Sequence, residues 1–261
     1  MPPASELLAL SGVTKRFGGL TAVDDVTFAV PVHTVHGVIG PNGAGKSTLV
    51  NMIAGAIRPT SGQIRFGERE IGRSPAHKRA ADGITRTFQE IRLFPEFTVL
   101  ENVVCGCHSQ RRTGVPDALF GLPRGRRERR EAVARAEEVI DFVGMTELAG
   151  VVAADLPYGH RRLVEVARAL APEPELVLLD EPAAGMNVNE RRNLVNLIAR
   201  IRDSGRTVVV IEHHMDVIMT ACSRITVLSQ GKKLSEGSPG EVQQDPAVLA
   251  AYLGPAVEEG A

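Results

Sequence analysis

The chain has 261 residues, of which 43% are hydrophobic, and its 30 basic and 31 acidic residues leave a formal charge of −1. This length and hydrophobic content suffice to bury a large core without disulfide staples. The near-zero charge argues against a nucleic-acid partner. The N-terminus has no basic segment followed by an apolar one, and no apolar run approaches the ~20 residues of a membrane-spanning helix, so work at a membrane would need other chains.

The three cysteines are too few for a closed disulfide framework, which suits a reducing compartment. Two of them lie in the run Cys105-Gly106-Cys107-His108, whose side chains are of metal-ligand type; the third is Cys222. No second ligand pair follows that run at zinc-site spacing. We therefore favour buried, inert thiols over a metal site.

The first third of the chain predicts short strands at residues 7–13, 26–30 and 35–39, and the last of these runs into a glycine-rich loop. From Lys46 the apolar spacing predicts a helix with one buried face, which Pro59 ends. Strand, glycine loop and helix in this order make the architecture of a phosphate site.

Residues 96–155 have a different character, with few β-branched runs. Apolar residues at three-and-four spacing from Val133 to Val143 predict a helix that Gly144 ends. We interpret this region as a helical subdomain. A basic stretch precedes the helix, and a solvated helix start explains it better than contact with anionic lipid or a partner; its members are Arg124, Arg126, Arg127, Arg129 and Arg130.

The last third alternates helices with two continuous apolar runs, residues 176–179 before Asp180-Glu181 and residues 207–211 before Glu212-His213. Continuous runs are typical of parallel strands buried on both faces. The pattern predicts an α/β fold with a mainly parallel sheet. Functional groups are then expected at the carboxyl ends of the strands.

The glycine-rich loop matches the Walker A pattern of nucleotide-binding proteins. Its glycines let backbone N–H groups curl around phosphates, and the following helix N-terminus adds favourable partial charge. Lys46 is expected to reach the β- and γ-phosphates of ATP, and Ser47 to ligate Mg²⁺. The predicted nucleotide-binding residues of the loop are Gly40, Pro41, Asn42, Gly43, Ala44, Gly45, Lys46, Ser47 and Thr48.

Asp180 and Glu181 supply the second half of the predicted site. Asp180 stands where a Walker B aspartate holds Mg²⁺, and Glu181 can polarise an attacking water. Two carboxylates capping a strand would be an adequate structural explanation without the phosphate loop. With that loop present, we favour the catalytic interpretation.

The order of phosphate loop, Gln89, Gly159 at the mouth of a helix, Asp180-Glu181 and His213 resembles the ATPase of ATP-binding-cassette (ABC) proteins over nearly the whole chain. The resemblance implies a P-loop NTPase (RecA-like) core with antiparallel β elements and an inserted α-helical subdomain. The implied boundaries are 1–95 for the first part of the core, 96–155 for the helical insert, 156–253 for the signature helix and second part of the core, and 254–261 for a tail.

The same resemblance assigns roles to single residues. Phe17 would stack on adenine, Gly159 would face the nucleotide of an opposing subunit, and His213 would contact the γ-phosphate beside the catalytic Glu181 and Lys46. Gln89, at a junction with the helical subdomain, would sense Mg²⁺ and the γ-phosphate. The implied metal ligands are Ser47, Gln89 and Asp180.

The signature segment departs from the family pattern Leu-Ser-Gly-Gly-Gln, because this chain has Leu156-Pro157-Tyr158-Gly159-His160. Pro157 has neither a hydroxyl nor a backbone N–H. This lack of donors would weaken the site completed on a partner and leave this chain's own site intact. We therefore expect two unequal ATP sites in a heterodimer.

Within the superfamily, four stretches resemble the ATP-binding subunits of branched-chain amino acid importers. The resemblance implies an ATPase at the cytoplasmic face of the membrane, paired with a second ATPase, two permease subunits and an extracytoplasmic solute-binding protein. The alternatives are a soluble ABC ATPase acting on cytosolic partners, urea or amide uptake, and lipid export. The four stretches are residues 86–89, 158–162, 181–187 and 211–213.

Overall fold

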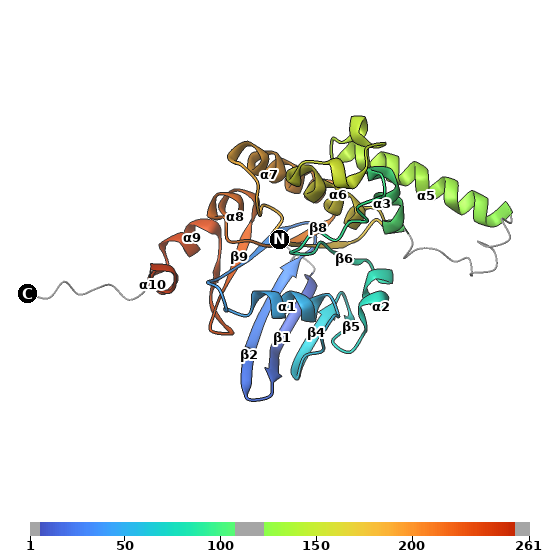
Figure 1. The fold of residues 1–261 in the computed structure, drawn as a ribbon. Helices are drawn as coiled ribbons and strands as arrows, with labels where there is room; N and C mark the ends of the chain where they lie inside the picture. The colour runs from blue at the N-terminus through green and yellow to red at the C-terminus, as the bar shows by residue number, and fades with distance from the viewer. Residues whose placement is uncertain (1–5, 108–122, 254–261) are drawn as a thin grey trace, which may run out of the picture.

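The structure is a computed structural model that describes residues 6–107 and 123–253 (Figure 1). Its strands are β1 Glu6–Phe17, β2 Leu20–Pro31, β3 Val35–Ile39, β4 Ser61–Phe66, β5 Arg69–Glu70, β6 Ile84–Arg86, β7 Leu176–Asp180, β8 Thr207–Ile211, β9 Arg224–Ser229 and β10 Lys232–Gly237. Its α-helices are α1 Lys46–Ile53, α2 Ala76–Ala81, α3 Val99–Gly106, α5 Pro123–Phe142, α6 Tyr158–Leu170, α7 Val188–Asp203, α8 Met215–Ala221, α9 Pro239–Gln244 and α10 Pro246–Leu253.

The strands form two sheets. The larger has the order β10-β9-β3-β8-β7-β6 and is parallel except for the edge strand β10. The smaller, in the order β2-β1-β4-β5, is antiparallel. This confirms the expected α/β class with antiparallel elements.

The larger sheet is buried on both faces. On β7, Val177 and Leu179 pack into a core shared with α3, α5, α6 and α7, whereas Leu176 and Leu178 pack into a second core shared with α1 and the antiparallel sheet. All five residues of β7 and of β8 are buried. The two continuous apolar runs are therefore central parallel strands, as the sequence predicts.

Helices α3, α5 and α6 pack against one another on one side of the larger sheet (Figure 1). The described part of residues 96–155 contains α3, α5 and two short 3₁₀ turns, Thr146–Leu148 and Ala153–Asp155. Gly144, at φ +76°, follows α5 as expected. Among the described residues, no helix combines the length and apolar character that crossing a bilayer requires.

Helix α1 ends earlier than its sequence predicts. It stops at Ile53 rather than near Pro59, and Gly55 follows with φ +78°. The buried guanidinium of Arg79 donates hydrogen bonds to the carbonyl oxygens of Met52 and Ile53, which are the last carbonyls of the helix. A Cβ at Gly55 would lie 2.8 Å from Arg79 Nε. A side chain from 26 residues further along the chain therefore caps α1.

Taken together, the cysteines with His108, the basic stretch and the predicted tail lie only partly within the described residues. Cys107 and Cys222 are buried and Cys105 is half-buried, whereas His108 lies outside the described residues. Arg127, Arg129 and Arg130 are exposed on α5, and the side chains of Arg124 and Arg126 are outside the description. The predicted tail 254–261 also lies outside it.

His36 on β3 makes stability depend on pH. The imidazole ring is buried, stacks on Phe28, and has its Nε2 2.9 Å from Thr226 Oγ1. Burial lowers the pKa of this imidazole to about 4. The fold therefore favours the neutral ring. The contribution of His36 to the free energy of unfolding is present above the unfolded-state pKa of about 6.5 and is lost as pH falls toward 4.

We expect the free energy of unfolding to fall by about 2 kcal/mol between pH 7 and pH 5 because of this residue. The His36→Val variant should lack that part of the pH dependence in urea titrations, whatever its stability at pH 7. Equal pH slopes for the variant and the wild type would contradict this prediction.

Candidate functional site

The loop between β3 and α1 can adopt its shape only with glycine at key positions. Gly40 and Gly45 have φ +151° and +98°. A Cβ on Gly40 would lie 2.2 Å from the carbonyl oxygen of Leu228, and one on Gly45 would lie 2.5 Å from that of Ala22. The neighbouring backbone leaves no room for a side chain at either position. Without side chains there, the backbone N–H groups of the loop can face an anion.

Lys46, the first residue of α1, points its ammonium back into this loop. Its Nζ donates to the carbonyl oxygens of Gly40 at 2.6 Å and Pro41 at 3.0 Å. Burial lowers the pKa of Lys46, and the nearby carboxylates of Glu181 and Asp180 oppose that shift. An ammonium held by carbonyls within a glycine loop matches the donor set that phosphate oxygens require.

Asp180 ends β7 in a buried position. Its backbone N–H donates to Thr87 Oγ1 at 3.0 Å, and Arg86 Nη2 lies 3.2 Å from its Oδ2. Burial raises the pKa of Asp180, and Arg86 works against that rise. Arg86 also donates to Asn51 Oδ1 on α1 at 2.6 Å. The carboxylate is thus fixed beside the helix that follows the phosphate loop.

Glu181 follows directly and sits in a strained backbone conformation with φ +48°. Its Oε2 accepts from Gln89 Nε2 at 3.3 Å and lies 3.8 Å from His213 Nδ1. Its backbone N–H donates to the carbonyl oxygen of Ile211 at 2.8 Å. Three residues from separate parts of the chain therefore meet at one carboxylate oxygen.

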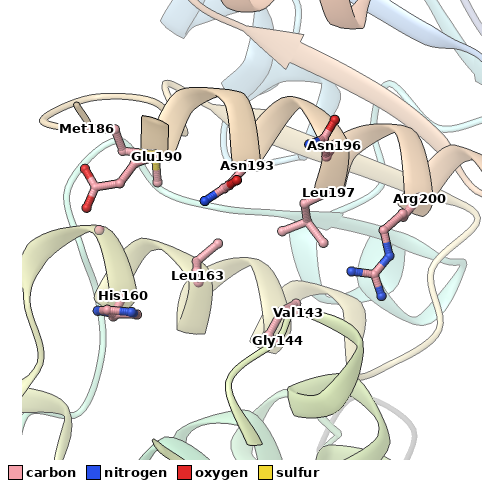
Figure 2. A pocket seen from close by; sticks show the side chains of 11 residues that line it. Val143, Gly144, His160, Leu163, Met186, Glu190, Asn193, Asn196, Leu197 and Arg200 are labelled. Atoms are coloured by element: carbon pink, nitrogen blue, oxygen red, sulfur yellow. The ribbon is translucent and has the colours of Figure 1, made fainter. Parts of the chain in front are cut away.

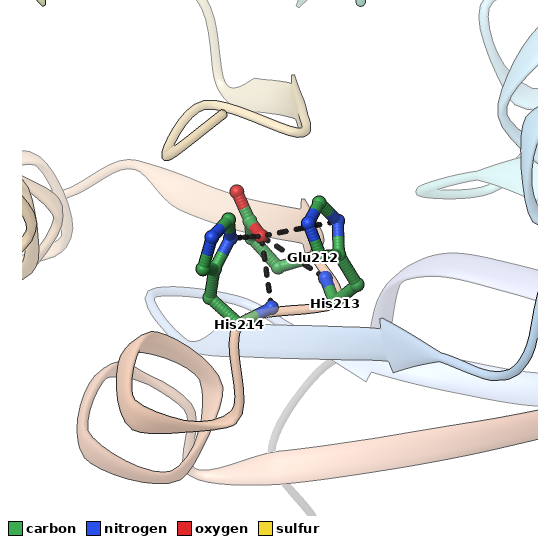
Figure 3. Close-up of side chains that lie close together, drawn as sticks. All are labelled: Glu212, His213 and His214. Carbon is green, nitrogen blue, oxygen red and sulfur yellow. Dashed lines mark hydrogen bonds and ion pairs between the residues drawn. The ribbon is translucent and has the colours of Figure 1, made fainter. Parts of the chain in front are cut away.

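Glu212 lies at the end of β8 and is completely buried (Figure 3). Its Oε1 accepts from the backbone N–H of Ala183 at 2.7 Å. Its Oε2 accepts from the backbone N–H groups of His213 at 3.0 Å and His214 at 3.1 Å, and lies 2.8 Å from His214 Nδ1. This carboxylate therefore joins the segment after Glu181 to the segment that carries His213.

A buried ion pair on α6 holds the segment around Gln89. Arg162 Nη1 donates to the carbonyl oxygen of Phe88 at 2.8 Å and lies 3.2 Å from Glu165 Oε2. Its Nη2 donates to the carbonyl oxygen of Gln89. Glu165 accepts from the backbone N–H of Arg92 at 2.9 Å, and burial raises its pKa. Helix α6 thus holds the backbone on both sides of Gln89 by hydrogen bonds to Phe88 and Arg92.

The N-terminus of α6 lies at Pro157, which provides no side-chain capping bond. Next to it, Gly159 is buried against Glu190 of α7, since a Cβ there would lie 2.7 Å from Glu190 Oε1. The ring of Tyr158 covers Gly185, where a Cβ would lie 2.7 Å from Tyr158 Cε1. Helices α6 and α7 also flank a groove of about 390 Å³ (Figure 2).

The sequence-predicted residues fall into two groups. The structure brings together Lys46, Asp180, Glu181, Gln89 and His213 at the carboxyl ends of β3, β7 and β8. Phe17 and Gly159 take no part in these contacts: Phe17 is 48% exposed on the β1-β2 hairpin beside Lys15, and Gly159 lies in the first turn of α6. Ser47 is exposed at the start of α1.

Four residues at the site were not predicted from the sequence: Arg86 as the partner of Asp180, the Arg162–Glu165 pair and Glu212. The available signal was charge at core positions. Arg162 and Glu165 interrupt the buried face of α6 at i, i+3 spacing, and Glu212 directly follows the fully buried β8. Buried charges occur almost always with partners, so such positions indicate an organised network.

Two family models match the chain. One, described as ABC transporter, matches residues 23–184. The other, described as branched-chain amino acid ATP-binding cassette transporter, matches residues 232–254, which include β10, α9 and α10.

Curated relatives align over nearly the full length. The high-affinity branched-chain amino acid transport ATP-binding protein LivG of Salmonella typhimurium is 42% identical over 96% of this chain and 98% of its own. BraF of Pseudomonas aeruginosa, of the same description, is 43% identical over the same shares. Among solved structures, a nucleotide-free ATP-binding cassette from an ABC transporter superposes with a TM-score of 0.85 at 30% identity, over 96% of this chain and all of that chain.

The Arg162–Glu165 pair gives a test of the buried network. We expect Arg162→Met to lower the free energy of unfolding by about 3 kcal/mol, because it leaves Glu165 buried without its main counter-charge. The double variant Arg162→Met/Glu165→Met should recover part of that loss, since no uncompensated carboxylate remains. Urea unfolding of both variants measures this; a double variant no more stable than the single one would contradict it.

Proposed function

The chain belongs to the ABC transporter family of ATP-binding proteins and is an ATPase of that type, and from this we propose that it energises an importer of branched-chain amino acids. The observation that carries the proposal is the convergence of Gln89, Glu181 and His213 beside the phosphate loop. The solute is inferred from the relatives' descriptions and from the family model that matches residues 232–254.

The phosphate loop would hold the β- and γ-phosphates of ATP through backbone N–H groups and the N-terminus of α1. Lys46 would exchange its bonds to the carbonyl oxygens of Gly40 and Pro41 for bonds to phosphate oxygens. An ammonium beside the transferring phosphoryl group stabilises charge that develops on its oxygens. Lys46 therefore serves both binding and catalysis in this proposal.

The residues available for Mg²⁺ are of suitable chemistry. Asp180 offers a carboxylate, Ser47 an exposed hydroxyl and Gln89 an amide, and all are oxygen ligands of the kind that Mg²⁺ prefers. When bound, Mg²⁺ neutralises phosphate charge and orients the phosphates. The chain's own part would be to orient Asp180, which Arg86 and Thr87 already hold.

Glu181 is proposed to orient the attacking water and accept its proton. The carboxylate is partly exposed, and its contact to Gln89 is long, so a water can take the place of that contact. His213, 3.8 Å away, would contact the γ-phosphate from the other side. Together they would position water and phosphoryl group for in-line attack.

A second ATPase subunit would complete each site. The N-terminus of α6 at Gly159 would face the partner's nucleotide, and exposed Phe17 would stack on adenine. Pro157 supplies no capping side chain there, which supports the proposal of unequal sites in a heterodimer. The nucleotide-binding core would comprise 1–95 and 156–253, with 96–155 as the helical subdomain.

A surface near Gln89 suits a membrane partner. The rings of Phe94 and Phe97 are tilted against each other at a centroid distance of 5.1 Å. They are 49% and 41% exposed and come just after the segment that Arg162 holds. Exposed aromatic pairs are typical of interaction sites. We propose that permease loops dock there, at the cytoplasmic face of the membrane, and that an extracytoplasmic binding protein delivers the solute to two permeases.

The Glu181→Gln variant tests the catalytic assignment. We expect it to bind ATP with near wild-type affinity, to hydrolyse it at least about 100-fold more slowly, and to accumulate as a closed dimer, because the amide cannot take the proton from water. Fluorescent-nucleotide titration, steady-state rates and size-exclusion chromatography measure these effects. Lys46→Ala is the contrast, since it should lose ATP binding. Rapid turnover by Glu181→Gln would refute the assignment.

Purification from gently solubilised native membranes tests the transport proposal. We expect mass spectrometry to identify two permeases and a second, non-identical ATPase with this chain. Replacing Phe94 and Phe97 by serine should reduce recovery of the permeases, while Leu234→Ser, at an exposed apolar position on β10, should not. Recovery from the cytosol with soluble partners alone would overturn the transport proposal and leave the ATPase intact.

A further inference from the structure

We propose that Glu212 is a positioning residue for hydrolysis, which rests on the ATPase function above and goes beyond it. Its side chain touches no reacting group in that mechanism. It acts through two chain segments, one that follows Glu181 and one that carries His213. Its buried carboxylate would keep these segments at a fixed separation, so that Glu181 and His213 act on the same phosphoryl group.

The contacts of Glu212 account for both of its oxygens. Oε1 accepts from the N–H of Ala183, two residues after Glu181, at 2.7 Å. Oε2 accepts from the N–H of His213 at 3.0 Å and from that of His214 at 3.1 Å, with His214 Nδ1 at 2.8 Å (Figure 3). Three of these four partners are backbone N–H groups, for which a carboxyl oxygen is the matching acceptor.

The two segments are distant in sequence, since Ala183 and Glu212 are 29 residues apart. Besides the β7-β8 ladder, one more backbone bond joins them at the site, from the N–H of Glu181 to the carbonyl oxygen of Ile211. That bond fixes the strand ends but not the residues beyond them. Glu212 fixes the next residues on both sides, Ala183 and His213, where the ladder has ended.

Glu212, His213 and His214 also have the ligand types of a metal site, with ligand atoms within 4.8 Å of one another. The hydrogen bonds argue for another role. Two backbone N–H groups already face Oε2, and His214 Nδ1 points at it as well, so a cation there would replace three favourable contacts. A carboxylate surrounded by N–H donors is an organising anion rather than an open metal ligand.

The contact between Glu212 and Ala183 is connected to helices α6 and α7 through the segment that follows Ala183. That segment includes Gly185, which lies under the ring of Tyr158 at the start of α6. It ends at Asn187, whose side chain caps α7. Movement of α6 would therefore reach His213 through Gly185, Ala183 and Glu212. The same carboxylate would thus coordinate the two catalytic side chains with the position of the signature helix.

The test compares Glu212→Gln with a matched control, Glu241→Gln. The change at Glu212 would keep the size of the side chain but place an NH₂ group against N–H donors. Glu241 also accepts a backbone N–H, from Ser238 at 2.7 Å, but lies on exposed α9. We expect Glu212→Gln to lower kcat by about tenfold or more while the KM for ATP changes less than about threefold. The control should change neither.

Amide hydrogen exchange provides a readout that does not depend on ATP hydrolysis. In Glu212→Gln, the amides of Ala183, His213 and His214 should exchange at least about tenfold faster, while those of β7 and β8 stay protected. Unchanged exchange at these three amides would overturn the link even if kcat fell. Faster exchange with unchanged kcat would overturn the positioning role. If the wild type hydrolysed no ATP, the proposed function would fail, and exchange would still decide the link.

Discussion

The parallel pairing of β3, β8 and β7 is the constraint on which the site depends. β7 and β8 run in register from Leu176 with Thr207 to Asp180 with Ile211, and β3 pairs with the other side of β8 up to Val38 with Ile211. The carboxyl ends of three strands therefore lie at one edge of the sheet. The phosphate loop, the two carboxylates after β7 and the Glu212-His213 pair all emerge there. Burial of both faces fixes this register, since a slip would exchange the two hydrophobic cores.

Negative charge gathers at this edge, and the carboxylates differ in how firmly they are held. Asp180 is fixed by Arg86 and by a bond from its own N–H to Thr87, and Glu212 by N–H donors on both oxygens. Glu181 has looser contacts, to Gln89 at 3.3 Å and to His213 at 3.8 Å. The group with the least saturated oxygens is the one whose proposed role is to exchange partners during the reaction, whereas the better-held groups provide a fixed frame.

Besides the hydrophobic core that α6 shares with the sheet, a few polar contacts join this helix to the segment around Gln89. Arg162 reaches from α6 to the carbonyl oxygens of Phe88 and Gln89, and its counter-charge Glu165 accepts from the N–H of Arg92. A buried pair of this kind contributes little net stability, because desolvation offsets its attraction, but it tolerates few alternative arrangements. Such a pair is therefore suited to keeping α6 and the segment around Gln89 in a fixed relative position. The exposed pair Phe94 and Phe97 follows the same segment along the chain.

The phosphate loop and the buried strands could be predicted from the sequence, because their causes are local. Glycine spacing sets the backbone from Gly40 to Gly45, and continuous apolar runs identify β7 and β8. Three features could not be predicted in this way, because they depend on tertiary packing: where α1 ends, which partners Arg162 and Glu212 take, and which residues meet at Glu181. The long-range contacts among these join positions 26 to 92 residues apart. A charged side chain at a core position indicates that a partner exists, but its identity depends on which segments the packed sheet and helices bring within hydrogen-bonding distance.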